Sequence, residues 1–425
     1  MHLLRPRFPS RASRLARLVM TGVLLLAASA AAIAAPVVLP GLGVDNDETS
    51  VSGLSSGAFM AVQFSVAYSA EIKGAGVIAG GPYYCAQGNV GIATSRCSCT
   101  GIPFFSACEV ARGATDVPRL VGITERLAAE GKVDPVSGLN AQRIWMFTGG
   151  RDSEVPSAVM EDLNDYYRRY VPAAQIHFVK DSRAEHTFPT ENFGNDCGQL
   201  GSPYLGKCGI DAAGELLNWI YGGNLNPRSD RQSGRLIKFD QNEFTASGNA
   251  AAVGLADTGY VYVPAACDHQ PGARCRLHVA FHGCRQNVTA VDEDFVRHAG
   301  YNLWADTNGI VVLYPQTRAR FATNPNACWD WFDFSRGDPD YANKNGRQMG
   351  AIKAMMSRLA GQRTPSGQGC FTASNADHVR AGRAYDRFFF AFAAGSGKLL
   401  GFDNDFTFTT LKQTAPRFYL PGNCP

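Results

Sequence analysis

The chain has 425 residues, 18% of them charged, and its formal net charge is only +3. So small an excess of charge gives no indication of a nucleic-acid partner or of an anionic membrane surface. The length suffices for one large domain, or for two domains, with a sizeable core.

The first 35 residues have the three-part pattern of a secretory signal. An opening with five arginines and no acidic residue precedes residues 18–32, which are mostly Leu, Val and Ala. Ala32 and Ala34 then stand where a signal peptidase requires small residues. The apolar run is short for a membrane span, although an uncleaved anchor is the alternative. We therefore expect a signal peptide at residues 1–34, a secreted or periplasmic protein, and no membrane attachment after cleavage.

Twelve cysteines in an exported chain indicate disulfides, since the compartment outside the cytoplasm is oxidising. They fall into local groups along the sequence, which are Cys85, Cys97, Cys99 and Cys108; Cys197 and Cys208; Cys267 and Cys275; Cys284 and Cys328; and Cys370 and Cys424. A metal site at Cys97 and Cys99 is disfavoured, because no histidine stands at ligand spacing nearby. Spacing alone leaves the connectivity open.

Beyond the signal, strand-like and helix-like apolar segments alternate. The strands expected, in chain order, are residues 49–52, 76–79, 144–148, 176–179, 260–263, 277–281 and 310–314. The helices expected are residues 58–68, 157–170, 212–221, 295–307 and 348–359. Such alternation predicts an α/β fold with a mostly parallel central sheet and helices on both faces.

Two segments interrupt this pattern. Residues 222–258 are polar and look like a long connection. Residues 367–425 are aromatic, rich in glycine and bracketed by cysteines, which is typical of a small appended unit. We expect one main domain at residues 35–366, followed by a C-terminal extension at residues 367–425.

Residues 53–57 read Gly-Leu-Ser-Ser-Gly, the G-x-S-x-G pattern of a nucleophilic serine. A serine at a sharp strand-to-helix turn has strained backbone angles, and glycines on either side let neighbouring chain pass closely. The pattern alone is weak evidence, but here a short strand precedes it and an amphipathic helix follows it. We therefore predict an α/β-hydrolase fold with Ser55 as the nucleophile.

A serine nucleophile needs a base, and the base needs an acid that orients it. In this fold the acid and then the histidine follow the serine, at the carboxyl ends of strands. Asp152 and His186 follow the third and fourth predicted strands, so they are the candidates. A turn aspartate and a loop histidine without a role are the alternatives. Asp181 and Glu185 are rival acids, but both stand too close to the histidine to come from a separate strand end.

Acyl transfer also needs two N–H donors for the oxyanion. One is expected to be the backbone amide of Ser56, and the other normally comes from a His-Gly loop after an earlier strand. A buried strand with a His-Gly pair does occur at residues 277–284, but far downstream of the serine motif. The halves of the fold therefore look exchanged, with residues 260–360 as the usual first half and residues 48–222 as the second.

A circular permutation explains this order without changing the packing, with residues 222–258 as the new connection. It predicts that the strand at 277–281 lies in one parallel sheet with the strand at 49–52. The alternative is two separate domains, but neither segment alone looks able to cover both faces of a sheet.

Five stretches of the chain carry a family resemblance. They are residues 51–61 (VSGLSSGAFMA), 79–85 (AGGPYYC), 185–190 (EHTFPT), 280–287 (AFHGCRQN) and 328–332 (CWDWF). Over residues 48–360 the chain resembles the short-chain-length poly(3-hydroxyalkanoate) depolymerases, which act on polyhydroxybutyrate, in the permuted type whose serine motif lies near the mature amino terminus. Any one stretch is modest evidence, whereas five in the order of this family are strong.

The resemblance implies a triad of Ser55, Asp152 and His186, with an oxyanion hole made by the amides of Ser56 and Cys284. It implies hydrolysis of ester bonds in poly(3-hydroxybutyrate) or its oligomers. We expect a monomer that needs no metal or cofactor. Another secreted esterase on this scaffold, for feruloyl, galloyl (tannin) or lipid esters, is the first alternative. A non-catalytic binding protein on a hydrolase scaffold is the second, and the complete set of Ser, Asp and His disfavours it.

The resemblance also implies a shallow apolar cleft for polymer. Trp329 and Trp331 would line this cleft, although two core tryptophans beside a disulfide are an equal alternative. We further predict a Cys284–Cys328 disulfide, since both cysteines stand in motifs of the family. Many members carry a linker and a separate domain that binds solid polymer. This chain has no such linker, and no function is predicted for residues 367–425.

Overall fold

The computed structural model describes residues 37–101, 108, 110–245, 248–268, 274–334, 338–361, 370–415 and 418–422. The predicted signal peptide and Cys424 lie outside these residues. Within the described ranges, no helix is long and apolar enough to cross a membrane.

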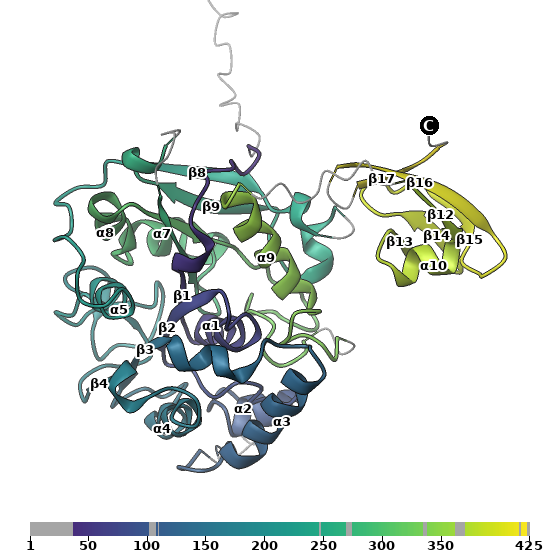
Figure 1. The fold of residues 1–425 in the computed structure, drawn as a ribbon. Coiled ribbons are helices and arrows are strands. Elements are labelled where there is room, and N and C mark those ends of the chain that lie inside the picture. The colour runs from purple at the N-terminus through teal and green to yellow at the C-terminus, as the bar shows by residue number, and fades with distance from the viewer. Residues whose placement is uncertain are drawn as a thin grey trace, which may run out of the picture. The chain divides into compact units, whose positions relative to one another are not determined.

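One large sheet organises the residues before 362 (Figure 1). Its strands, from one edge to the other, are β4 (Ile176–Asp181), β3 (Arg143–Gly149), β2 (Ile72–Ile78), β1 (Thr49–Leu54), β10 (Arg276–Phe281), β11 (Ile310–Tyr314), β9 (Thr258–Val263) and β8 (Arg235–Asp240). The pairs from β4 to β11 are parallel, whereas β9 runs antiparallel to both of its neighbours. The predicted α/β-hydrolase fold with a mostly parallel sheet is confirmed.

Helices cover both faces of this sheet, because its strands bury side chains on both sides. In β3, Ile144 and Met146 belong to one hydrophobic cluster while Trp145 and Phe147 belong to the other, as the twofold period of a strand requires. The first cluster includes side chains of α1 (Ser56–Ala67), α3 (Val117–Ala129), α4 (Ser157–Tyr167) and α9 (Arg347–Leu359). The second includes side chains of α5 (Ala212–Ile220), α7 (Asp294–His298) and α8 (Tyr301–Asn308).

The chain enters this sheet in the middle. β1 pairs with β2 on one side and with β10 on the other, with Thr49 opposite Leu277 and Gly53 opposite Phe281. β1 to β4 therefore fill one half of the sheet, and β8 to β11 fill the other half much later in the chain. The prediction that residues 49–52 and 277–281 share one parallel sheet is confirmed, and separate domains for these segments are excluded. The circular permutation itself stays an interpretation of this strand order.

Three expectations about local structure were wrong or incomplete. The single helix expected at residues 295–307 is two helices, α7 and α8, because Gly300 between them has a left-handed φ of 100°. The supposed connection at residues 222–258 contains β8, which forms the edge of the sheet. α3 was not predicted, although its buried Val117, Leu120 and Leu127 have helical spacing.

Disulfides join the cysteines within the local groups seen in the sequence. The described bonds are Cys85–Cys97, Cys99–Cys108, Cys197–Cys208, Cys267–Cys275 and Cys284–Cys328. The predicted Cys284–Cys328 bond is confirmed. It closes the longest loop of these five, with 44 positions between its ends.

Residues 370–422 form a small unit of their own, drawn in yellow in Figure 1. One three-stranded sheet contains β12 (Cys370–Ser374), β16 (Phe408–Ala415) and β17 (Phe418–Pro421), and another contains β13 (Ala384–Arg387), β14 (Phe390–Ala393) and β15 (Leu399–Phe402). α10 (Asn375–Arg380) follows β12. The cluster buried inside the unit is small and consists of Ala393, Ala394, Leu411 and Tyr419.

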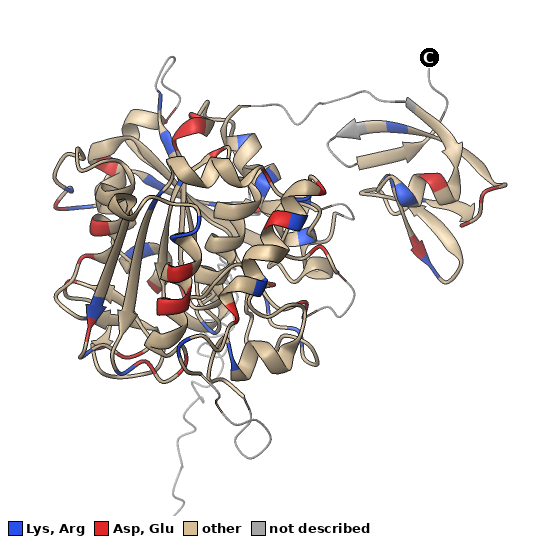
Figure 2. Cartoon of the chain, turned by 60° about the horizontal axis from the view of Figure 1, so that its bottom comes forward, with Lys and Arg blue, Asp and Glu red and all other residues tan. Residues whose placement is uncertain are grey.

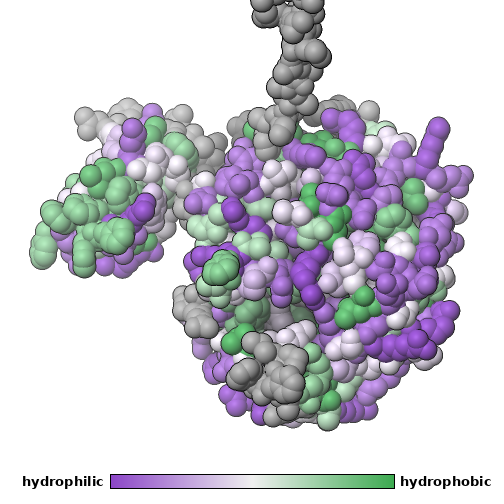
Figure 3. All heavy atoms as spheres, turned by 180° about the vertical axis from the view of Figure 1, so that it is seen from behind, coloured by the Kyte–Doolittle hydropathy of each residue, from purple (hydrophilic) through white to green (hydrophobic). Residues whose placement is uncertain are grey.

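Large apolar side chains are exposed on this unit. They are Phe388, Phe389, Leu399, Phe402, Phe406, Phe408 and Phe418. Figure 3 shows hydrophobic residues gathered on one face of the unit, at the left of the view. Figure 2 shows basic and acidic residues interspersed over the main body.

Candidate active site

Ser55 stands at a strained turn between β1 and α1. Its φ of 56° and ψ of −124° lie in a region that residues with a side chain rarely adopt. The flanking glycines are required by close packing. A Cβ on Gly53 would lie 2.3 Å from the carbonyl carbon of Gly57, and a Cβ on Gly57 would lie 2.4 Å from the carbonyl oxygens of Phe281 and His282. The first turn of α1 therefore rests directly on the chain that leaves β10.

Asp152 and His186 meet as an acid–base pair. Asp152 lies in the loop after β3, and His186 lies in the loop after β4. The Nδ1 atom of His186 is 2.9 Å from Oδ2 and 3.0 Å from Oδ1 of Asp152, and both side chains are almost completely buried. Oδ1 of Asp152 also accepts the backbone N–H groups of Glu154 at 3.0 Å and Val155 at 2.6 Å, which fixes the carboxylate.

The two rival acids have other partners. Asp181 at the end of β4 forms an ion pair with Arg183. The carboxylate of Glu185 accepts the backbone N–H of His186 rather than a ring N–H. Burial lowers the pKa of His186, but the charges of Asp152, Glu154 and Glu185 outweigh it, so the pKa lies above the ordinary value of 6.5.

The loop after β10 lies against the serine turn. Its Cys284 is tied to Cys328, and the amide of Gly283 donates to Oε1 of Gln286 at 2.8 Å. A Cβ on Gly283 would be 3.5 Å from the carbonyl oxygen of Leu54, the residue before Ser55. The loop that carries the Cys284 amide is therefore held beside the end of β1, and the role of that amide in an oxyanion hole stays a prediction.

His282, which begins this loop, is a neutral structural histidine. It is fully buried, and burial lowers its pKa to about 4. Nε2 accepts the backbone N–H of Thr317 at 3.2 Å, so Nδ1 carries the proton and donates to the carbonyl of Gly283 at 2.6 Å. Its role is therefore to hold the loop rather than to transfer protons.

The two tryptophans differ in position. Trp329 has no exposed surface, and its indole N–H donates to the carbonyl of His282 at 2.9 Å while its backbone N–H reaches Oγ of Ser56 at 3.3 Å. Trp329 therefore supports the loop from the core and offers no surface to polymer. Trp331 is 8% exposed and stacks on Phe59 of α1, with ring centroids 4.1 Å apart. Its place in a polymer cleft stays a prediction.

A buried polar network fixes β1 from the other face of the sheet. His278 of β10 is 2.7 Å from Oγ of Ser50 through Nδ1 and 2.7 Å from Oγ of Ser52 through Nε2. The hydroxyls of Tyr221 and Tyr301 bond the same two serines. Burial lowers the pKa of His278 to about 3, so the ring is neutral. The strand that ends at the nucleophile is thus anchored by side-chain as well as backbone bonds.

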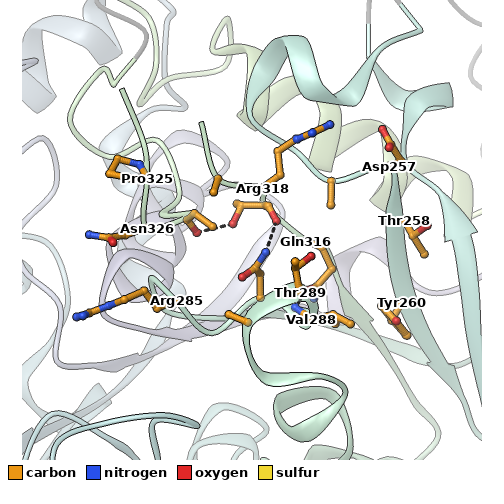
Figure 4. Close-up of a pocket in the computed structure, with 16 residues that line it drawn as sticks. Asp257, Thr258, Tyr260, Arg285, Val288, Thr289, Gln316, Arg318, Pro325 and Asn326 are labelled. Carbon is orange, nitrogen blue, oxygen red and sulfur yellow. Dashed lines mark hydrogen bonds between the residues drawn. The ribbon is translucent and has the colours of Figure 1, made fainter. Parts of the chain in front are cut away.

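A cavity of about 540 Å³ adjoins the loop after β10. Figure 4 shows Arg285, Pro325 and Asn326 on one side of it and Thr258 and Tyr260 on the opposite side. Ser55, Asp152 and His186 do not line it. Among the described residues, no cluster of three or more His, Cys, Asp or Glu side chains has the arrangement of a metal site.

Sequence reasoning missed the residues that hold these loops. Gln286 and Thr317 fix the backbone around Cys284, while Glu154 and Arg285 join two loops across the site. Gln286 could have been noticed, because it stands in the stretch 280–287 that carried the resemblance. Thr317 gave no local signal, since its partner is 35 positions away.

Comparisons with known proteins agree with one another. Residues 260–401 match the family described as "Esterase PHB depolymerase". A poly(3-hydroxybutyrate) depolymerase of Delftia acidovorans is 36% identical, with the match covering 96% of this chain and 99% of that protein. A polyhydroxybutyrate depolymerase of Talaromyces funiculosus is 36% identical and covers 79% of this chain and 96% of its own length.

Solved structures give the same result. A PHB depolymerase complexed with an R3HB trimer has a TM-score of 0.67 and 35% sequence identity, covering 76% of this chain and 99% of that one. The crystal structure of the PHB depolymerase from Penicillium funiculosum has a TM-score of 0.67 and 34% identity.

Fold and site together define the class. A serine at a strained strand-to-helix turn, followed along the chain by a buried Asp–His pair at the same edge of a parallel sheet, is the arrangement of an α/β-type serine hydrolase. More particularly, the chain belongs to the PHB depolymerase family of carboxylic ester hydrolases.

Proposed function

We propose that this protein is an exported serine esterase that hydrolyses the ester bonds of poly(3-hydroxybutyrate) or its oligomers. The observation that carries the proposal is the buried pair of Asp152 and His186, which follow the second and third strands along the sheet from the strand that ends at the strained Ser55. The substrate is inferred from the relatives, whose names state that polyester.

The chemistry uses three side chains. Oγ of Ser55 attacks the ester carbonyl carbon while Nε2 of His186 takes the hydroxyl proton, and Asp152 stabilises the resulting imidazolium at Nδ1. The tetrahedral intermediate then collapses, the bond to the leaving alkoxide breaks, and His186 returns the proton to that oxygen. Water then attacks the acyl-enzyme while His186 takes a proton from the water. When the second tetrahedral intermediate collapses, His186 returns this proton to Oγ of Ser55, which frees the serine and releases a hydroxyacid.

The oxyanion is held by backbone amides. The amide of Ser56 belongs to the first turn of α1, where N–H groups lack partners within the helix. The amide of Cys284 belongs to the loop that the Cys284–Cys328 bond and Gln286 hold against the end of β1. Two fixed donors aimed at developing charge are typically worth factors of about 10² to 10³ each in rate.

Export is supported by the disulfides. Five bonds join described cysteines in short and long loops alike, and such bonds persist in oxidising compartments. We propose that the protein acts in the periplasm or outside the cell.

We also infer that residues 370–422 adsorb to solid polyester. Phe388 and Phe389 form the tip of the hairpin between β13 and β14, and these residues are 79% and 84% exposed. Both have positive φ angles, of 52° and 67°, where a hairpin normally carries Asn or Gly. The strained turn costs free energy, and the two exposed rings contribute nothing to the hydrophobic core of the unit. Contact with an apolar solid would bury them.

The central test is turnover of amorphous polyhydroxybutyrate granules by the purified mature protein. Ser55→Ala should lower the rate by about 10⁴-fold or more without unfolding the chain. It should also abolish labelling by a fluorophosphonate, yet the variant should still sediment with granules. Retention of more than a few per cent of the activity would assign the nucleophile elsewhere. Faster release from feruloyl or galloyl esters than from polymer would favour the alternative substrates.

A further inference from the structure

A second carboxylate faces the base from the side opposite Asp152. Oε2 of Glu154 lies 3.5 Å from Nε2 of His186, the ring atom that Asp152 leaves free. The Glu154 side chain is only 17% exposed, so the charge is poorly screened by water. In the proposed reaction Nε2 is the atom that takes and returns the proton, and a carboxylate next to it has a direct influence on that step.

Glu154 does not move freely at this place. Its other oxygen, Oε1, accepts a hydrogen bond from Nη2 of Arg285 at 2.7 Å. Arg285 directly follows Cys284, and its own backbone N–H donates to the carbonyl of Asn326 at 2.7 Å. The backbone carbonyl of Glu154 in turn accepts the N–H of Cys99. The ion pair therefore links the loop that holds Asp152 with the loop that holds the Cys284 amide.

Several other charged groups face His186. Asp152 meets Nδ1, and the carboxylate of Glu185 accepts the backbone N–H of His186 and lies on its own loop. Arg285 approaches from the loop after β10, with Glu154 between it and the ring. Three carboxylates and one guanidinium thus surround a ring that is buried from water. Of the three carboxylates, Glu154 is the one that approaches Nε2.

We propose that Glu154 is a positioning residue, which stabilises the protonated ring of His186 at Nε2 and, through Arg285, keeps the base and the oxyanion loop in fixed relation. The inference rests on the proposed function, since it concerns the same base. Only the neutral ring can take the serine proton. Because Glu154 favours the protonated ring, the enzyme is inactive in acid up to a higher pH than it would be without this carboxylate. The direction agrees with the raised pKa of His186, to which Asp152, Glu154 and Glu185 contribute.

The test is the pH dependence of kcat/KM for p-nitrophenyl butyrate, a soluble ester. In Glu154→Gln the acidic limb should move to lower pH by about half a unit to one unit, because one neighbouring negative charge is lost. Glu154→Asp, which keeps the charge but withdraws it by one methylene group, should give an intermediate shift. Glu161→Gln is the matched control. It removes one carboxylate from nearby α4, where the partners are Arg112 and Lys180, and should leave the limb in place.

A second measurement does not depend on turnover. The ring nitrogens of His186 can be titrated by nitrogen-15 NMR in the wild type and in Glu154→Gln, with His186→Gln used to assign the signal. The pKa should be lower in Glu154→Gln. An unmoved limb together with an unmoved titration would overturn the inference, as would an equal shift in Glu161→Gln. If the wild type hydrolyses no ester at all, the proposed function fails instead, while the titration still decides whether Glu154 acts on His186.

Discussion

The main body and the C-terminal unit treat their aromatic residues in opposite ways. In the body, large rings such as Trp145, Trp329 and Tyr301 are fully buried, because a sheet with helices on both faces offers two cores to fill. The C-terminal unit has only a four-residue buried cluster and leaves rings such as Phe406 almost completely exposed. Aromatic content alone therefore does not tell whether a segment forms a core. The rings are buried in the main body, whereas in the C-terminal unit many of them form its surface.

We assign catalysis to the main body and adsorption to the C-terminal unit. A variant of Asp152 should remove catalysis and leave adsorption unchanged. Asp152→Asn should lower kcat by about 10⁴-fold on polymer and soluble ester alike, because the amide favours the wrong tautomer of His186. Sedimentation with granules should not change. A near-normal rate would transfer the role of the acid, first to Glu185.

A variant of the unit should produce the opposite pattern. The triple variant in which serine replaces Phe388, Phe389 and Phe406 should turn over solid polymer about tenfold more slowly, or slower still, at low polymer loading. Each ring buried against an apolar surface contributes about 1.5–3 kcal/mol to the contact. Hydrolysis of p-nitrophenyl butyrate should be unchanged.

Phe321→Ser provides the matched control for this experiment. Phe321 is fully exposed on the main body, so its loss removes an equal ring from a different surface. It should leave adsorption intact. Equal loss of adsorption in Phe321→Ser, or none in the triple variant, would break the division between the two regions.

The smallest expected effect is the change with pH in the free energy of unfolding of the main body, which depends on its buried histidine His278. The pKa of His278 is about 3 in the fold and ordinarily 6.5, so the unfolded chain binds a proton below pH 6.5 while the folded chain does not. The contribution of this neutral ring is complete above pH 6.5 and declines as the pH falls toward 3. Between pH 7 and pH 5 the loss is about 2 kcal/mol.

Asp330 acts in the opposite sense, since burial raises its pKa to about 7 and protonation then favours the fold in acid. The measurement is therefore a difference. The free energy of urea unfolding should be compared between the wild type and His278→Gln at both pH values. The advantage of the wild type should shrink by about 2 kcal/mol at pH 5.

Local patterns predicted what local physics determines. The sequence around Ser55 specifies a strand, a strained turn and a helix within a few residues of one another, and Asp152 and His186 follow recognisable strands, so their meeting could be anticipated. β8 was missed because its apolar Leu236, Ile237 and Phe239 were judged by the polarity of the whole segment.

Contacts between distant segments left no such signal. Glu154 and Arg285 are 131 positions apart, and nothing in either neighbourhood indicates the other. Trp329 illustrates the same limit, since its composition suited a cleft as well as a core. Only the packing of α1, β10 and the Cys284 loop around it decides for the core.

The entry of the chain into the middle of the sheet has a consequence for its synthesis. β1 is made early, but the partner for one of its edges, β10, follows much later, and Ser50 meets His278 across 228 positions. Until then that edge presents unpaired N–H and C=O groups, which invite wrong pairing with other chains. The nucleophile and one predicted oxyanion donor thus lie on opposite sides of a strand pairing that forms late in synthesis. A ribosome-bound or half-translocated chain has no working centre, and first turnover reports that this pairing has formed.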